Sequence, residues 1–167
     1  DATYAFDAGS LVGGTALRTL TLAVGTAAVD TGTITAAGMT TLTSVGTTGA
    51  TTFDTITAAA MTDMSVTTTT GAQTIAGITA AALTDLTLTS TEGAIAQTGA
   101  IAAAALTNLT AETTTGALSI GALTTGVTAS NPLKTVSYTS TTGKVTIADI
   151  SASTGTAITA MTSYTIV

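Results

Sequence analysis

The chain has 167 residues, of which 45% are hydrophobic and only 7% are charged, and its formal net charge is −6. This balance excludes ordinary disorder, which needs high charge and low apolarity. The basic residues Arg18, Lys134 and Lys144 are too few to neutralise a nucleic-acid backbone. Without Cys or His there is no disulfide, no thiolate metal site and no imidazole base. No apolar run approaches the roughly 18 residues of a membrane helix, so we predict that the chain is not membrane-spanning.

Residues 1–11 precede the first repeat and contain Tyr4 and Phe6, which alternate with small residues as in a strand. Terminal residues commonly cover the open end of a stack of repeats. We therefore interpret residues 1–11 as an N-terminal cap or as a strand that docks onto another subunit.

A six-residue unit, typified by Leu83-Thr-Asp-Leu-Thr-Leu88, recurs seven times along the chain. Its copies begin at Leu17, Met39, Met61, Leu83, Leu106, Leu133 and Met161. These starting points are 22, 22, 22, 23, 27 and 28 residues apart. A nearly fixed period in this range predicts a stack of similar coils.

The end of each unit alternates between apolar and polar residues, as in Leu86-Thr-Leu88, which indicates a half-buried strand with Thr on its outer face. The residues three positions after each start should form one interior stack: Leu20, Leu42, Met64, Leu86, Leu109, Val136 and Tyr164. Glycine follows ten residues after five of the starts, where we expect turns with positive φ: Gly49, Gly71, Gly93, Gly116 and Gly143. A second alternating segment follows this glycine, and a third segment has an aliphatic residue followed by small residues, as in Ile78-Thr-Ala-Ala-Ala. Three short strands and three corners are the composition of a β-helix coil.

We therefore predict an all-β fold, a parallel β-solenoid (β-helix) of about six to seven coils with a ~22-residue repeat, over residues 12–167. Two insertions rich in Gly, Ser and Thr, near residues 125–132 and 151–157, should form loops at one corner. Two alternatives remain open. The spacing Leu-x-x-Leu-x-Leu also fits a leucine-rich-repeat arc, and the alternation fits a β-sandwich.

No residue is assigned a catalytic, cofactor-binding or metal-binding role, and we expect no enzyme. The nine acids occupy scattered positions of the repeat: Asp1, Asp7, Asp30, Asp54, Asp63, Asp85, Glu92, Glu112 and Asp149. A polysaccharide-cleaving site would need them clustered on one face.

Asp63 and Asp85 share one repeat position, and Asn108 follows in the next repeat. Stacked side chains there would lie about 4.8 Å apart. Such oxygens suit Ca²⁺, but an Asx turn at a corner is the interpretation that we favour. Asn108-Leu-Thr110 also fits the N-glycosylation pattern, although Thr110 is equally explained as an outer strand residue.

Threonine ladders on a β-solenoid can form an ice-binding face when paired Thr-x-Thr occurs in nearly every coil. Thr87-Leu-Thr89 and Ser65-Val-Thr67 fit this pattern, whereas Thr21-Leu-Ala23 and Thr110-Ala-Glu112 do not. Ice binding therefore remains an alternative.

The Ala-, Thr- and Gly-rich composition, with the repeat Met61-Thr-Asp-Met-Ser-Val66, resembles the β-strand-repeat regions of bacterial extracellular surface proteins. These include surface-layer proteins and large secreted adhesins. The resemblance covers nearly the whole chain and implies a cell-surface location, a structural and self-assembling role, and a dependence on calcium in some members. It assigns no functional residue.

The expected function is thus a structural extracellular protein that forms a filament, sheath or surface-layer lattice. The alternative is an extracellular binding module, either an adhesin segment or an ice-binding solenoid. The expected partner is a second copy, bound head to tail through the C-terminal coil, which contains Met161-Thr-Ser-Tyr-Thr-Ile166, and residues 1–11.

Overall fold

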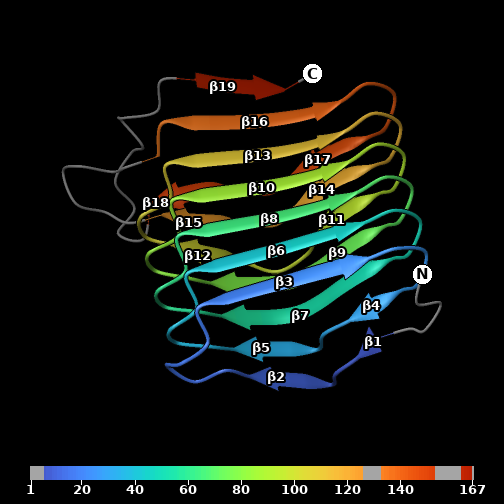
Figure 1. The fold of residues 1–167 in the computed structure, drawn as a ribbon. Helices are drawn as coiled ribbons and strands as arrows, with labels where there is room; N and C mark the ends of the chain where they lie inside the picture. The colour runs from blue at the N-terminus through green and yellow to red at the C-terminus, as the bar shows by residue number, and fades with distance from the viewer. Residues whose placement is uncertain (1–5, 126–132, 153–162, 167) are drawn as a thin grey trace.

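The protein is a parallel β-solenoid, as predicted. The computed structural model describes residues 6–125, 133–152 and 163–166. These residues form nineteen short strands in a seven-stranded and a twelve-stranded sheet, with no helix among them (Figure 1). Every pair of neighbouring strands is parallel, which rules out the antiparallel β-sandwich. The twelve-stranded sheet occupies the part of each coil where a leucine-rich repeat would have a helix or an irregular arc, so that alternative is wrong as well.

The seven-stranded sheet, here called the front sheet, is built around the last four residues of each six-residue unit that the sequence repeats. Its strands are β3 (Thr19–Val24), β6 (Thr41–Gly46), β8 (Asp63–Thr68), β10 (Asp85–Ser90), β13 (Asn108–Thr113), β16 (Thr135–Ser140) and β19 (Ser163–Ile166). Each strand pairs with the next coil's strand without a register shift, so equivalent repeat positions form straight columns.

The twelve-stranded sheet bends around the other two sides of the coil. The second side contains β1 (Phe6–Asp7), β4 (Val29–Asp30), β11 (Ile95–Gln97), β14 (Leu118–Ile120) and β17 (Val145–Ile147). The third side contains β2 (Ser10–Val12), β5 (Thr33–Thr35), β12 (Ile101–Ala103), β15 (Leu123–Thr125) and β18 (Ile150–Ala152). β7 (Thr51–Thr57) and β9 (Gln73–Thr79) are long enough to run through both sides.

About five coils, from β4 to β16, pair with a neighbouring coil on both sides, slightly fewer than the six to seven expected. The first coil (β1, β2, β3) pairs only with the second, and the last (β17, β18, β19) only with the sixth, within the described residues. The count of five is lower than expected because it leaves out the two end coils, each of which pairs with one neighbouring coil among the described residues.

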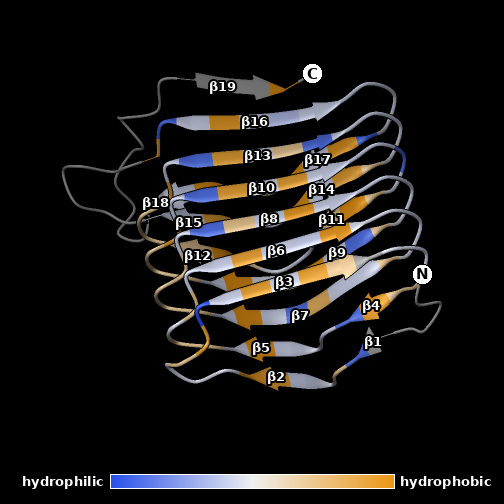
Figure 2. Cartoon of the chain, in the orientation of Figure 1, coloured by the Kyte–Doolittle hydropathy of each residue, from blue (hydrophilic) through white to orange (hydrophobic). Residues whose placement is uncertain are grey.

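The core is a set of apolar columns inside the coil, visible as aligned orange bands in Figure 2. Five members of the predicted interior stack are at most 1% exposed and in register: Leu42, Met64, Leu86, Leu109 and Val136. Leu20, in the first coil, is only partly buried. Tyr164 continues the register, but its side chain lies outside the described residues.

The glycines ten residues after the repeat starts mark corners, as expected, but the prediction of positive φ is wrong. Positive φ is found at Gly9, Gly14 and Gly32 instead. The corner glycines are needed because consecutive corners approach each other closely. A Cβ added at Gly93 would collide with the carbonyl oxygen of Gly71, and one at Gly116 would collide with that of Gly93.

Buried hydroxyls support these corners from inside the coil. Thr68 Oγ1 donates a hydrogen bond to the carbonyl of Gly71 (2.7 Å), and Ser140 Oγ donates to that of Gly116 (3.1 Å). Gly116 N in turn donates to Thr113 Oγ1 (3.0 Å). The alternation of the sequence gave no sign of this polar column, because Thr and Ser are equally common on outer strand faces.

Parts of the predicted organisation fall on residues that are not described. In the segment 1–11, Phe6–Asp7 and Ser10–Leu11 pair with the second coil, while residues 1–5 lie outside the described chain. Its function as a cap or docking strand stays a prediction. Most of the loops expected near 125–132 and 151–157 also lies outside the described residues.

We predict that Gly93→Ala destabilises the protein by about 1–3 kcal/mol, the range for overpacking a close contact, because the new methyl group meets the backbone of Gly71. Gly77→Ala is the matched control, since its nearest atom, the carbonyl oxygen of Ala100, is 3.7 Å from the added Cβ. Urea denaturation of both variants measures the difference. Equal losses would show that the corners are not closely stacked.

Candidate functional site

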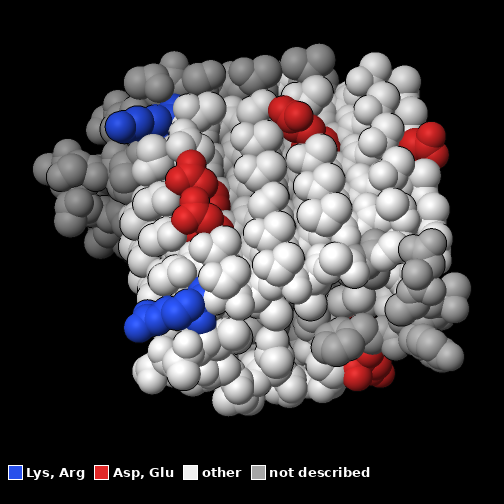
Figure 3. Space-filling view, in the orientation of Figure 1, with Lys and Arg blue, Asp and Glu red and all other residues white. Residues whose placement is uncertain are grey.

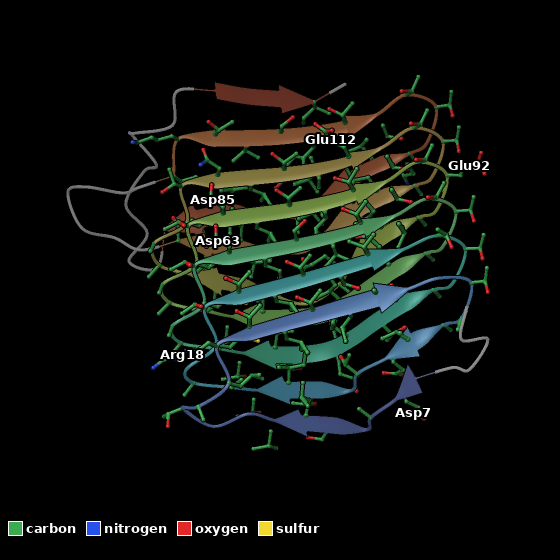
Figure 4. The ribbon with its side chains drawn as sticks, in the orientation of Figure 1. Asp7, Arg18, Asp63, Asp85, Glu92 and Glu112 are labelled. Atoms are coloured by element: carbon green, nitrogen blue, oxygen red, sulfur yellow. The ribbon has the colours of Figure 1, made fainter. Side chains whose placement is uncertain are left out.

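The acidic side chains are spread over the surface, as the sequence indicated. Figure 3 shows one compact acidic patch on the front sheet and isolated acids elsewhere, and Figure 4 places Glu92 and Glu112 far from that patch. In the described part of the chain, no group of three or more acids could hold a metal ion.

The acidic patch consists of Asp63 and Asp85, which are in register on neighbouring strands of the front sheet (Figure 4). Asn108 continues their column and donates a hydrogen bond from Nδ2 to Asp85 Oδ1 (2.7 Å). Asp63 Oδ2 accepts a hydrogen bond from Thr62 Oγ1 (2.6 Å). The expected column is confirmed, but these carboxylates accept from side chains and form no Asx turn, so that interpretation is wrong.

Asx turns occur instead at Asp7 and Asp30. Asp7 Oδ1 accepts from Gly9 N (3.1 Å), and Asp30 Oδ1 accepts from Gly32 N (2.9 Å). Both glycines have positive φ, which such a turn favours. The shared pattern Asp-x-Gly between two short strands is the sequence signal for these turns, which the repeat pattern alone did not predict.

Asn108, the potential glycosylation site, is the first residue of β13 and is half-buried. Its amide is engaged with Asp85. Thr110, two residues later, stands in the outer column of the same strand, between Thr87 and Ser137. The positions of Asn108 and Thr110 in β13 therefore explain both residues of the N-glycosylation pattern by their structural roles.

Hydroxyl side chains form one unbroken column along the middle of the front sheet: Thr21, Thr43, Ser65, Thr87, Thr110 and Ser137. The two flanking columns are interrupted by residues without a hydroxyl group: Ala23, Val45, Asp63, Asp85, Asn108 and Glu112. Threonines also pair in register on the other sides, as in Thr52 with Thr74 and Thr57 with Thr79. Threonine thus does not distinguish one face of the solenoid.

A shallow hollow lies on the third side, where β9, β12 and β15 meet. Its lining comprises Thr79, Ala81, Ala102, Ala103, Ala104, Thr124 and Thr125. None of these residues is charged, and most present only a methyl group. The hollow therefore offers few directional contacts to a ligand.

The two ends of the solenoid are the surfaces with the least complete burial. Among the residues that the structure describes, seven hydrophobic residues are only partly buried against the core, and these belong to the end coils: Leu11, Leu17, Leu20, Leu22, Val145, Ile147 and Ile150. Ile166 on β19, in an interior column, is 52% exposed, and Val12 on β2, in an outer column of the first coil, is 75% exposed. We call the face formed by β1, β2 and β3 the N-end surface, and that formed by β17, β18 and β19 the C-end surface.

Comparison of the chain with protein-family models, with curated proteins and with solved structures found no match. Among the described residues, none belongs to a helix with the length and apolarity to cross a membrane.

We predict that Asp85→Asn stabilises the protein at low ionic strength by about 0.2–1 kcal/mol, because like charges at directly opposed strand positions are unfavourable and Asp85 opposes Asp63. Added salt should shrink this gain. Asp54→Asn makes the same charge change away from the patch and should have little effect. Thermal unfolding with a chelator and with CaCl₂ checks the result. A stabilisation by Ca²⁺ that Asp85→Asn abolishes would instead establish a calcium site.

Proposed function

We propose that the protein is a structural, self-assembling extracellular protein whose chains associate through their ends into a filament, sheath or surface lattice. The observation that carries this proposal is the incomplete burial of both end surfaces. Strand edges that lack a neighbour present unpaired N–H and C=O groups, which attract another strand. At each end these edges adjoin partly exposed core residues, such as Leu20 and Val145.

The middle of the molecule is much less suited to association. Most apolar side chains of the five central coils are fully buried, and their outer faces carry Thr, Ser and a few acids. Val45 is an exposed large hydrophobic residue on these faces, at 51%. The apolar surface available for association is therefore concentrated at the ends.

The cell-surface location rests on the composition that this chain shares with surface-layer proteins and adhesins. The proposal gives the chain no catalytic role, no cofactor and no nucleic-acid partner. Calcium enters it only through the acidic patch at Asp63 and Asp85.

A second candidate function is that of a binding module, an adhesin segment or an ice binder. The unbroken hydroxyl column of the front sheet favours it, because Thr87 and its equivalents repeat at the strand spacing of about 4.8 Å. The charges of Asp63 and Asp85 on the same sheet count against an ice-binding face. An ice-growth assay on the purified protein tests it, and no effect on crystal growth would remove it.

We predict that Ile166→Lys abolishes self-assembly, because it places a charge on the C-end surface, where another chain would have to desolvate it. Val45→Lys is the matched control: Ile166 and Val45 are 52% and 51% exposed, but Val45 lies on a side face. Light scattering and electron microscopy of both variants measure the outcome.

Circular dichroism should show that both lysine variants remain folded. If Val45→Lys blocks assembly and Ile166→Lys does not, association is lateral and the end surfaces are not its site. If the unmodified protein stays monomeric at high concentration, the proposed function is wrong.

A further inference from the structure

We propose that the N-end surface of one copy binds the C-end surface of another in the register of the internal coils, so that the solenoid continues across the junction. This inference rests on the proposed function and specifies its contact. In such a joint β1, β2 and β3 of the second copy pair with β17, β18 and β19 of the first. The partner is therefore a second copy of this chain.

The columns of the core define which residues would meet. One column runs from Leu11 through Ile34, Ile56, Ile78, Ile101 and Leu123 to Ile150. Its two end members are both only partly buried. Stacking Leu11 of one copy on Ile150 of another would give each the neighbour that its equivalents already have.

The front sheet has the same property. The interior column that begins at Leu22 ends at Ile166, after Tyr138 in β16. Tyr138 is completely buried, whereas Leu22 is partly buried and Ile166 is 52% exposed. Placing Leu22 of the next copy on Ile166 extends this column and removes apolar surface from water, which is favourable.

The outer residues of the joint are compatible as well. The column of Asp7 on the second side ends at Thr146, and the column of Val12 on the third side ends at Ser151. Across the joint an acid would therefore meet a hydroxyl group, and no like charge of the other copy would be directly opposed to Asp7, which already opposes Asp30 within its own chain. Repulsion at this position would cost stability.

Strand direction also favours head-to-tail stacking over a symmetric contact. All pairs in the structure are parallel, and only an N-end surface placed on a C-end surface keeps that direction. Two C-end surfaces facing each other would bring their strands together in antiparallel orientation and break the columns. A head-to-tail contact is heterologous, and it propagates into an open filament when the rotation does not close.

Paired cysteine substitutions test the register, because the parent chain contains no Cys. In-register residues on neighbouring strands have Cα atoms about 4.8 Å apart, within the usual disulfide range of about 4.4–6.8 Å. The matched variants are Asp7→Cys with Thr146→Cys, and Val12→Cys with Ser151→Cys. The mismatched controls are Asp7→Cys with Ser151→Cys, and Val12→Cys with Thr146→Cys.

The four double variants share the same four substitutions, so effects on folding are common to matched and mismatched pairs. Within one chain the paired sites lie at opposite ends of the stack, six coil steps or about 29 Å apart. Intramolecular disulfides are therefore impossible. After mild oxidation, we expect non-reducing gels to show a ladder of covalent oligomers for both matched variants and monomer for both controls.

Light scattering before oxidation separates the inference from the proposed function. Assembly with equal cross-linking in all four variants, or with cross-linking only in the controls, would overturn the register while leaving self-assembly intact. The absence of assembly and of cross-links would overturn both. Dimers that stop at two chains would indicate a symmetric contact and would also overturn the inference.

Discussion

The structure depends on the close, in-register hydrogen bonding of each coil to the next. Parallel strands about 4.8 Å apart leave no room for a side chain where the backbone itself turns the corner, and this explains the stacked glycines from Gly49 to Gly143. At the corner before the front sheet, Thr84 makes two bonds to the carbonyl of Thr62, one from its backbone N–H (2.9 Å) and one from its hydroxyl (3.0 Å). The repeat is therefore set by backbone spacing as much as by the apolar core.

A molecule of this kind is nearly one-dimensional, because each coil contacts only its two neighbours. The sides are complete in the five central coils: their strands pair with a neighbour along both edges, most of their inner apolar residues are buried, and their outer residues are mostly Thr and Ser. The ends are incomplete, since the first and last coils each lack one neighbour within the described residues. Both the proposed self-assembly and the register proposed for it follow from this single asymmetry between sides and ends.

The sequence predicted the fold well because the repeat is strict. Leu42, Met64 and Leu86 recur at 22 residues, and any parallel stacking at that period must bring them into one column. It predicted local chemistry less well. The corner glycines avoid a collision between consecutive coils, and this contact cannot be seen within the sequence of one repeat. The buried hydroxyl of Thr68 and the outer hydroxyl of Thr67 belong to neighbouring residues of the same type, so the sequence does not distinguish them. The sequence partly predicted the two end surfaces, but the columns that match across them could be identified only from the strand register of the structure.

Hydrogen exchange of the backbone amides, compared between the monomer and the assembled protein, tests the central claim most directly. Protection reports which strands lose access to water. The account predicts that amides of the first and last coils, such as those of β3 and β19, gain protection on assembly, while those of β8 and β10 are already protected and change little. Gains spread along the outer side faces, with β3 and β19 unchanged, would contradict it.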